Sequence, residues 1–363
     1  MTTDQQIGHP DIRFCRSRDG TRLAFTVCGT GRPIVMVPLH FGEDLDAPSL
    51  FNARHWVEGL SGQARVVRYD VRGCGYSDSN FEPSTLESWA DDLDAIVRVF
   101  APEPVTLLAI SHGALPAARY ANLHPQQVSH LIVVGGSARG RSRRGPNPAL
   151  EQETRAQREA MASGWGFDQN FSAAFRRVFY SRTFPGATDA QLAEIDATMH
   201  RRWSADCLLA YSTAVWQADV SADASKLSCP SLVLHSRDDQ VVPLDEGRRL
   251  AALIPGARFV TLSSAYHMLP GYDGEWPRVL AETKSFLGLA DQFNDLSALT
   301  PRQIEVLRLV SKGHTDKEIA RNLQLSPRTV EMHVGRALAA LQCHTRAEAV
   351  RFAAERGLFS MPD

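Results

Sequence analysis

Short apolar segments alternate with longer segments of helical periodicity along most of the chain. Six apolar segments have the length and composition of buried strands. They are residues 34–37, 65–69, 105–110, 131–134, 231–234 and 258–262. Between them, residues 86–100 and 244–253 have the 3.6-residue periodicity of helices. This alternation predicts a doubly wound parallel sheet of the α/β class, and residues 12–27 add a hairpin that turns at Asp19-Gly20.

A second pattern interrupts this alternation at residues 137–225. A basic, turn-rich segment at 139–144 precedes four segments with helical patterns. These are residues 149–162, 171–180, 189–203 and 206–216. We interpret residues 137–225 as a helical cap over the sheet. Its tryptophans (Trp165, Trp203, Trp216) are expected to pack inside the cap, while some apolar surface faces a cavity beneath it.

The chain from Leu299 onward predicts four short helices. Capping boxes, in which a threonine is followed three residues later by Gln or Glu, mark three helix starts. They are Thr300 with Gln303, Thr315 with Glu318, and Thr345 with Glu348. The remaining helix begins at Ser326 with Pro327 in its first turn, and Gly313 ends the first helix.

The third of these helices has two different faces. Its apolar stripe is expected to pack on the two helices before it and comprises Val330, Val334, Ala337, Leu338 and Leu341. The opposite face carries Thr329, Met332, His333 and Arg336. Such a face is suited to reading base edges in a major groove, while Lys317, Arg321 and Arg328 hold phosphates. The alternative is a docking or oligomerisation module with a solvated polar face.

Composition narrows the choice of protein class. Of 363 residues, 22% are charged and 44% hydrophobic, as in ordinary globular proteins. The net charge is −2, but residues 299–363 hold ten Lys and Arg against seven Asp and Glu, which leaves −5 for the rest. No apolar run is long enough to span a bilayer and no signal peptide is evident, so a cytoplasmic protein is expected. The six cysteines have no C-x-x-C spacing, and neither a metal nor a cofactor is expected.

A candidate nucleophile is Ser111, which directly follows the apolar segment 105–110. Ala109 and Gly113, two residues to either side, leave room for a sharp turn from strand to helix. Ordinary turn chemistry is the alternative, because the usual G-x-S-x-G pattern has glycine where this chain has Ala109.

Two further residues complete a candidate catalytic triad. Asp239 and His267 each lie in a loop just past a predicted strand, and the order Ser, Asp, His is that of α/β-hydrolase triads. We assign Ser111 as nucleophile, His267 as base and Asp239 as the carboxylate that orients it, with Asp238 as the alternative carboxylate. The backbone N–H groups of His40 and His112 are the candidate oxyanion donors. His235, within a strand, is interpreted as a core residue.

Residues 11–288 resemble the α/β-hydrolase superfamily, specifically hydrolase-like domains fused to signalling modules in bacteria. The resemblance is carried by Ser111 and by the motifs VVRYDVRGCGYSD and LVLHSRDDQVVP. It implies the hydrolase fold and a pocket for a small molecule. Besides Ala109, the chain departs from the family at Pro38-Leu39, where many members have His-Gly.

Residues 299–358 closely resemble the LuxR-type helix-turn-helix domain, and residues 289–298 form the linker. The matching sequence is LTPRQIEVLRLVSKGHTDKEIARNLQLSPRTVEMHVGRALAAL. The resemblance implies DNA binding through the helix that begins at Ser326, commonly as a homodimer. Ala339 and Ala340 replace basic residues often found late in that helix, which favours binding as a dimer over binding as a monomer.

Three hypotheses follow from these two parts. In the first, the chain is a transcriptional regulator whose hydrolase-like domain binds, and slowly hydrolyses, a small effector such as an ester, lactone or amide. In the second, it is an active serine hydrolase that carries a DNA-binding tail. In the third, the large domain only dimerises the protein.

Overall fold

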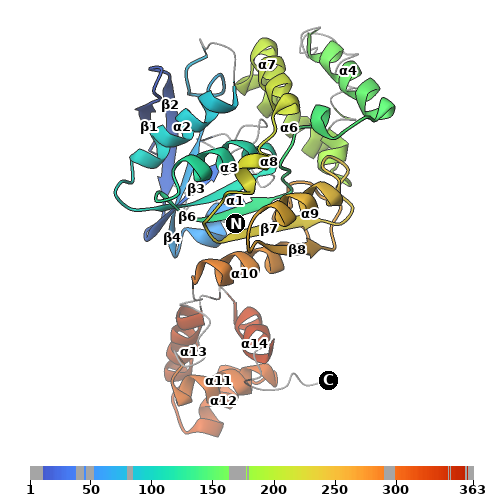
Figure 1. The fold of residues 1–363 in the computed structure, drawn as a ribbon. Coiled ribbons are helices and arrows are strands. Elements are labelled where there is room, and N and C mark those ends of the chain that lie inside the picture. Colours follow the sequence, from blue (N-terminus) through green and yellow to red (C-terminus); the bar gives the residue numbers. More distant parts are fainter. Residues whose placement is uncertain are drawn as a thin grey trace. The chain divides into compact units, whose positions relative to one another are not determined.

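The computed structural model describes residues 11–37, 45, 53–79, 85–162, 177, 180–289, 299–341, 343, 345–355 and 358. The chain divides into two compact units, residues 1–287 and 288–363 (Figure 1). The predicted boundaries of the two domains remain predictions, because nearly all of the predicted linker lies outside the described residues. No helix in the described part is long and apolar enough to cross a membrane.

The first unit is built on an eight-stranded sheet in the order β1-β2-β4-β3-β5-β6-β7-β8. The strands are β1 (Arg13–Arg16), β2 (Arg22–Cys28), β3 (Arg32–Val37), β4 (Ala64–Tyr69), β5 (Val105–Ile110), β6 (Val128–Val134), β7 (Ser231–Ser236) and β8 (Arg258–Leu262). The hairpin β1-β2 joins β4 in antiparallel register, and all other pairs are parallel. Every residue of β5 is buried, as expected for a central strand covered on both faces.

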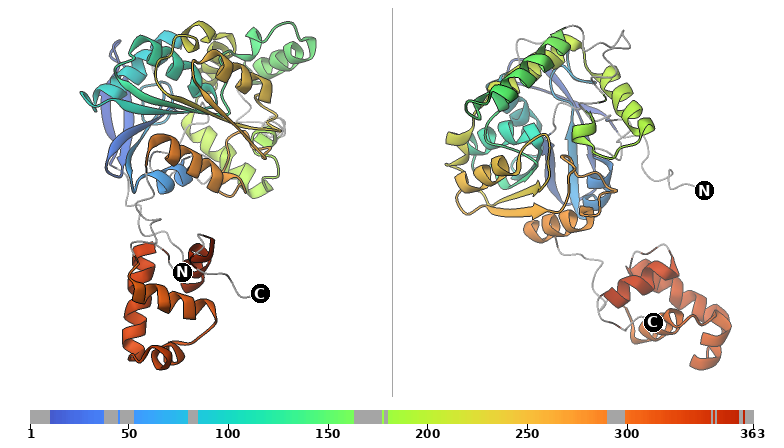
Figure 2. Two further views of the ribbon diagram at one scale, coloured as in Figure 1. Left: turned by 60° about the horizontal axis from the view of Figure 1, so that its bottom comes forward. Right: turned by 90° about the vertical axis from the view of Figure 1, so that its right-hand side faces the viewer.

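Helices cover both faces of this sheet, which confirms the doubly wound prediction. Figure 2 shows α1 (Arg54–Leu60) and α10 (Trp276–Leu287) on one face and α2 (Leu86–Arg98), α3 (Ala114–Leu123) and α9 (Leu244–Leu253) on the other. On the first face Trp56 meets Trp276 edge to face, with ring centroids 4.7 Å apart. The sheet thus holds the ends of its strands in fixed relation, and the loops after them carry the site.

Helices of the predicted cap follow β6. They are α4 (Pro148–Ala162), α6 (Asp189–Arg202), α7 (Ala205–Gln217) and the short α8 (Ser221–Ala224). The predicted helix 171–180 lies largely outside the described residues, as does Trp165. Trp203 packs against Tyr211 as expected, with ring centroids 5.5 Å apart. At the end of α6, Arg202 forms a buried ion pair with Asp70, which directly follows β4 and so ties the cap to the sheet.

The second unit contains the four predicted helices. They are α11 (Pro301–Ser311), α12 (Asp316–Leu323), α13 (Pro327–Leu341) and α14 (Arg346–Glu355). At the start of α11, Gln303 N–H donates to Thr300 Oγ1 at 3.3 Å, and Thr300 N–H donates to Gln303 Oε1 at 2.7 Å. At the start of α12, the Glu318 carboxylate accepts from both the N–H and the hydroxyl of Thr315, each at 2.8 Å. Local side-chain caps therefore set where these helices begin.

Two small apolar clusters hold this second unit together. One gathers Val306, Ile319, Ala320, Val330 and Val334 from α11, α12 and α13. The other includes Leu307, Ala337, Leu341 and Ala349, and adds α14. Arg346 also reaches across to Asp316 with two hydrogen bonds of 2.5 and 2.8 Å. The apolar stripe predicted for residues 330–341 is therefore the face that packs.

Candidate functional site

Ser111 lies at a sharp corner between β5 and α3. Its backbone φ of +52° falls in the left-handed region, which is uncommon for any residue other than glycine. A short 3₁₀ turn, Ser111–Gly113, then leads into α3. Room for this corner comes from Gly136, because a Cβ there would lie 2.7 Å from Ala114 Cβ and 3.1 Å from the Ser111 carbonyl oxygen. Ala109 at the expected glycine position therefore does not prevent the turn.

The structure brings Ser111, His267 and Asp239 into one hydrogen-bonded row. His267 Nε2 is 2.7 Å from Ser111 Oγ, and His267 Nδ1 is 2.7 Å from Asp239 Oδ2. All three residues are buried, with 2%, 1% and 8% of Ser111, His267 and Asp239 exposed. The imidazole can therefore take a proton from the hydroxyl while its other ring nitrogen donates to the carboxylate.

Asp239, rather than Asp238, is the carboxylate of this row. Its Oδ1 accepts hydrogen bonds from the N–H groups of Val241 at 2.8 Å and Val242 at 2.9 Å, which fix the carboxylate plane. Asp238 is exposed. Burial alone would raise the pKa of Asp239, but His267 and the backbone donor of Val242 outweigh it and hold that pKa below its ordinary value.

A second histidine lies behind Asp239. His235 is fully buried, as expected of a core residue, and its Nε2 donates to the Val242 carbonyl oxygen at 2.9 Å. The same Nε2 is 3.6 Å from Asp239 Oδ2. Burial lowers the pKa of His235 and so favours its neutral form. Its Nδ1 has no hydrogen-bond partner among the described residues. Through its bond to Val242, His235 supports the loop that carries Asp239.

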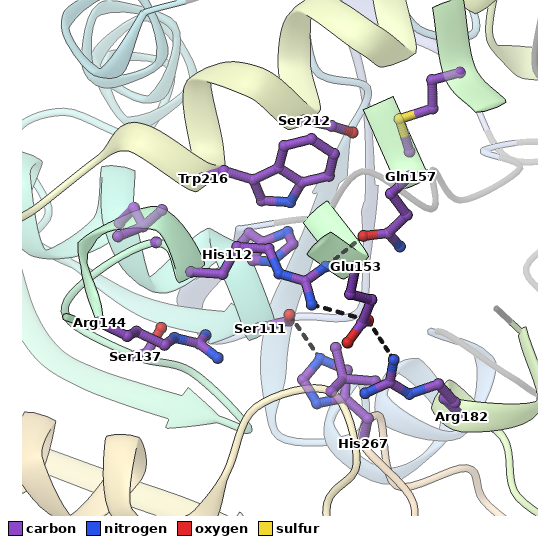
Figure 3. A pocket seen from close by; sticks show the side chains of 15 residues that line it. Ser111, His112, Ser137, Arg144, Glu153, Gln157, Arg182, Ser212, Trp216 and His267 are labelled. Carbon is purple, nitrogen blue, oxygen red and sulfur yellow. Dashed lines mark hydrogen bonds and ion pairs between the residues drawn. The ribbon is translucent and has the colours of Figure 1, made fainter. Parts of the chain in front are cut away.

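A pocket opens above Ser111 between the sheet and the cap (Figure 3). It contains about 740 Å³ of empty space, part of which is open to solvent. Ser111, His112 and His267 form its floor, and Leu115, Met161 and Trp216 are among its apolar walls. Trp216 thus faces the cavity as well as packing in the cap. Of the two candidate oxyanion donors, His112 lines this pocket, whereas His40 lies outside the described residues.

Sequence reasoning missed the charged side chains of this pocket. Arg141, Arg144, Glu153 and Arg182 all line it. Glu153 accepts from Arg141 Nη2 at 2.9 Å and forms a second ion pair with Arg182. The only signal in the sequence was the basic segment 139–144, which the pattern marked as a turn. Nothing in the chain order indicated that it would face Ser111.

The second unit places the predicted DNA-contacting residues on two adjacent helices. Arg328, Met332 and Arg336 on α13 are exposed, whereas Thr329 and His333 are half-buried. Lys317 and Arg321 on α12 are exposed as well. Gln324, with a left-handed φ of +53°, makes the tight turn between the two helices. Ser326 Oγ caps α13 by accepting from the Thr329 N–H at 3.1 Å.

Comparison with known proteins agrees with both halves of this description. The family described as alpha/beta hydrolase fold matches residues 46–272, and the family described as bacterial regulatory proteins, luxR family, matches residues 297–353. The chain therefore belongs to the α/β-hydrolase fold family. More particularly, it is a hydrolase-family domain followed by a LuxR-family DNA-binding domain, which confirms the resemblance and the fold class predicted from the sequence.

Relatives of the hydrolase domain are named for different enzymatic activities. The non-heme chloroperoxidase CPO-A1 of Kitasatospora aureofaciens is 26% identical over 74% of this chain and 98% of its own length. A 2-hydroxy-6-oxononadienedioate/2-hydroxy-6-oxononatrienedioate hydrolase of Cupriavidus pinatubonensis is 27% identical over 70% of this chain and 88% of its own. The structure of the enol-lactonase from Burkholderia xenovorans LB400 is similar in fold, with a TM-score of 0.61, 22% identity and coverage of 76% and 100%.

Proposed function

We propose that the protein is a DNA-binding transcriptional regulator whose hydrolase-family domain binds a small-molecule effector and slowly hydrolyses it. The row from Ser111 through His267 to Asp239, under a cap and in one chain with a LuxR-family domain, is the observation that carries this proposal. The relatives named above act on different substrates, so similarity to them does not identify the ligand of this chain. A chromosomal DNA partner implies action in the cytoplasm.

The hydrolytic step follows from the two 2.7 Å contacts of His267. Ser111 Oγ attacks the carbonyl carbon of an ester, and His267 Nε2 takes the hydroxyl proton and passes it to the leaving alcohol as the C–O bond breaks. Asp239 stabilises the imidazolium, and the N–H groups of His112 and His40 stabilise the oxyanion. Water then attacks the acyl-enzyme, His267 accepts its proton, and the acid leaves as Ser111 regains a proton.

The DNA-binding half of the proposal uses α13 as the helix that enters the major groove. Met332, His333, Thr329 and Arg336 contact base edges, and Lys317, Arg321 and Arg328 contact phosphates. A homodimer on two half-sites about 34–36 Å apart supplies the affinity that one weakly basic domain lacks. Arg336→Ala should lower affinity for a selected operator by about 1–3 kcal/mol if Arg336 contacts a base. Equal losses on operator and random DNA would instead assign Arg336 to the phosphates.

The regulator hypothesis is tested by measuring whether a ligand of the hydrolase-family domain changes DNA binding by the LuxR-family domain. Operators are selected from random duplexes with the full chain, and the DNA dissociation constant is then measured against a panel of esters, lactones and amides. We expect at least one compound to change that constant, and Ser111→Ala to lose ester hydrolysis while it keeps the response. A DNA dissociation constant that stays unchanged with every compound that binds in the pocket would overturn the proposal.

An active hydrolase that merely carries a DNA-binding tail is the second candidate, favoured by the same hydrogen-bonded row. It predicts rapid turnover of esters with no effect of substrate on DNA affinity. A purely architectural large domain predicts neither turnover nor a response. The same experiment separates all three.

A further inference from the structure

The walls of the pocket above Ser111 carry more positive than negative charge. Among the described lining residues, three are arginines (Arg141, Arg144, Arg182) and Glu153 is the one carboxylate. Glu153 forms ion pairs with both Arg141 and Arg182, and a dashed line in Figure 3 marks the pair with Arg182. One carboxylate therefore forms ion pairs with two guanidinium groups, and the third arginine, Arg144, is not paired with it.

Arg144 has no ion-pair partner in the part of the chain that the structure describes. Its side chain makes no hydrogen bond there, and its Nε is buried without an acceptor. Two carboxylates lie close enough to influence it, but both are occupied. Glu246 accepts two hydrogen bonds from Arg139, at 2.8 and 3.0 Å, and Asp239 is bound to His267.

The electrostatic surroundings of Arg144 show the same imbalance. Burial is the largest effect and lowers its pKa, and the cations of Arg141 and Arg139 act in the same direction against Glu246 and Asp239. A guanidinium nevertheless remains protonated in a protein. Arg144 as a whole is half-buried, and partial loss of hydration without a partner makes an anion supplied by a ligand favourable there.

Arg144 and the reacting serine line the same pocket. In Figure 3 the guanidinium of Arg144 extends into the pocket on the side where Ser111 and His267 lie. The same pocket is also lined by three apolar side chains, Leu115, Met161 and Trp216. A ligand that satisfies both the charge and the apolar lining has an apolar body and an anionic end.

We infer that the ligand of this pocket carries a free carboxylate held by Arg144, alongside the acyl group that Ser111 attacks. A guanidinium matches a carboxylate with two parallel hydrogen bonds, which a neutral ester cannot accept as strongly. The ligand class is thus a half-ester, lactone or amide of a dicarboxylic acid. This inference rests on the proposed function only in that the pocket binds a ligand.

The test compares two activated esters of similar length. One is mono(4-nitrophenyl) glutarate, which keeps a free carboxylate, and the other is the 4-nitrophenyl ester of monomethyl glutarate, which is neutral. We expect the wild type to prefer the anionic ester in kcat/KM. Arg144→Gln should reduce that preference by about 10- to 100-fold, as expected for loss of a charge-assisted hydrogen bond. Arg144→Lys should retain part of it.

The control variant removes a charge elsewhere. Arg249 is exposed on α9 and outside the pocket, so Arg249→Gln should leave kcat/KM for both esters as in the wild type. A wild type that prefers the neutral ester, or an Arg144→Gln variant with an unchanged preference, overturns the inference and leaves the regulator proposal standing.

A binding measurement covers the case in which no ester is turned over. Calorimetry with Ser111→Ala compares monomethyl glutarate, dimethyl glutarate and inorganic phosphate as ligands. Binding of the monoester that Arg144→Gln abolishes supports the inference even without hydrolysis. Equal binding of the monoester and the diester overturns it, and so does binding of inorganic phosphate without binding of the monoester.

Discussion

The two units of this protein reach their functional geometry by opposite routes. In the DNA-binding unit, helix starts are marked by caps such as that of Thr300 on Gln303, only three residues apart. In the hydrolase unit, Ser111 and His267 are hydrogen-bonded although they lie 156 positions apart in the sequence. The tail is thus organised by local chemistry and the pocket by the sheet that aligns distant loops. Substitutions in the two units should therefore have separable effects.

The largest separable effect is expected for Ser111→Ala. Removing the hydroxyl should lower kcat/KM for 4-nitrophenyl acetate by about 10⁴-fold, because no other described side chain is bonded to His267 Nε2 as a nucleophile. DNA affinity without ligand should stay at the wild-type value, since the second unit has its own apolar clusters. Spectrophotometric measurement of nitrophenol release checks the loss of hydrolysis, and a gel-shift titration checks the DNA affinity. A variant that still hydrolyses the ester at the wild-type rate would refute the role of Ser111.

The converse separation is expected for Leu307→Ala in the core of the tail. Leu307 is fully buried, and its truncation should cost about 2–5 kcal/mol, enough to unfold a unit of this size. Operator binding should be lost while ester hydrolysis persists. Leu123→Ala, at a leucine that is 53% exposed, is the matched control and should change neither. Loss of hydrolysis in Leu307→Ala would show that the units do not fold separately.

A smaller effect tests the close packing behind Asp239. A Cβ at Gly247 would lie 2.3 Å from His235 Nδ1, and the fully buried ring has little room to move. Gly247→Ala should therefore lower the free energy of unfolding by about 1–3 kcal/mol and reduce kcat by displacing the loop that holds Asp239. Urea unfolding followed by tryptophan fluorescence measures the first effect. Gly274→Ala, where a Cβ meets nothing within 4 Å, should be silent in both assays.

The smallest effect concerns the ion pair between α12 and α14. The hydrogen bonds from Arg346 hold the pKa of Asp316 below its ordinary value of 3.8, although burial opposes them. Because the folded-state pKa is depressed, the pair stabilises the tail above the unfolded-state pKa, and this is lost as pH falls through the folded-state pKa. Asp316→Asn should cost about 0.5 kcal/mol at pH 7, since the pair is partly exposed.

Circular dichroism during urea unfolding can measure this loss, because all tryptophans and tyrosines precede residue 299 and fluorescence reports only the first unit. The variant should differ from the wild type at pH 7 and approach it in acid, below the pKa of Asp316. A difference that grows as the pH falls would contradict the sign of the pKa shift.

The same contrast explains what the sequence could predict. Apolar periodicity and threonine caps predicted the four tail helices and the strands of the sheet, because those signals lie within a few residues of the structure they specify. The row of Ser111, Asp239 and His267 could be proposed because each follows a recognisable strand. The choice between Asp238 and Asp239 needed the structure, which buries only Asp239 against the imidazole.

Features that depend on contacts between distant segments could not be read from the sequence. Gly136, which makes room for Ser111, lies two residues past the end of β6, the neighbour of β5, so the missing glycine at position 109 was misleading. Arg144 and Glu153 face the pocket only because the cap folds back over the sheet. Neither has a local pattern that distinguishes it from an ordinary surface charge.

The central claim is that occupying the pocket at Ser111 changes how the tail binds DNA. Phenylmethanesulfonyl fluoride tests it directly, because Ser111 Oγ bonds to sulfur, fluoride leaves and His267 takes the proton. The DNA dissociation constant is measured before and after complete modification, with Ser111→Ala treated in parallel. The account predicts a change of about fivefold or more in the wild type and none in the variant. Fully modified protein that binds its operator with unchanged affinity would contradict it.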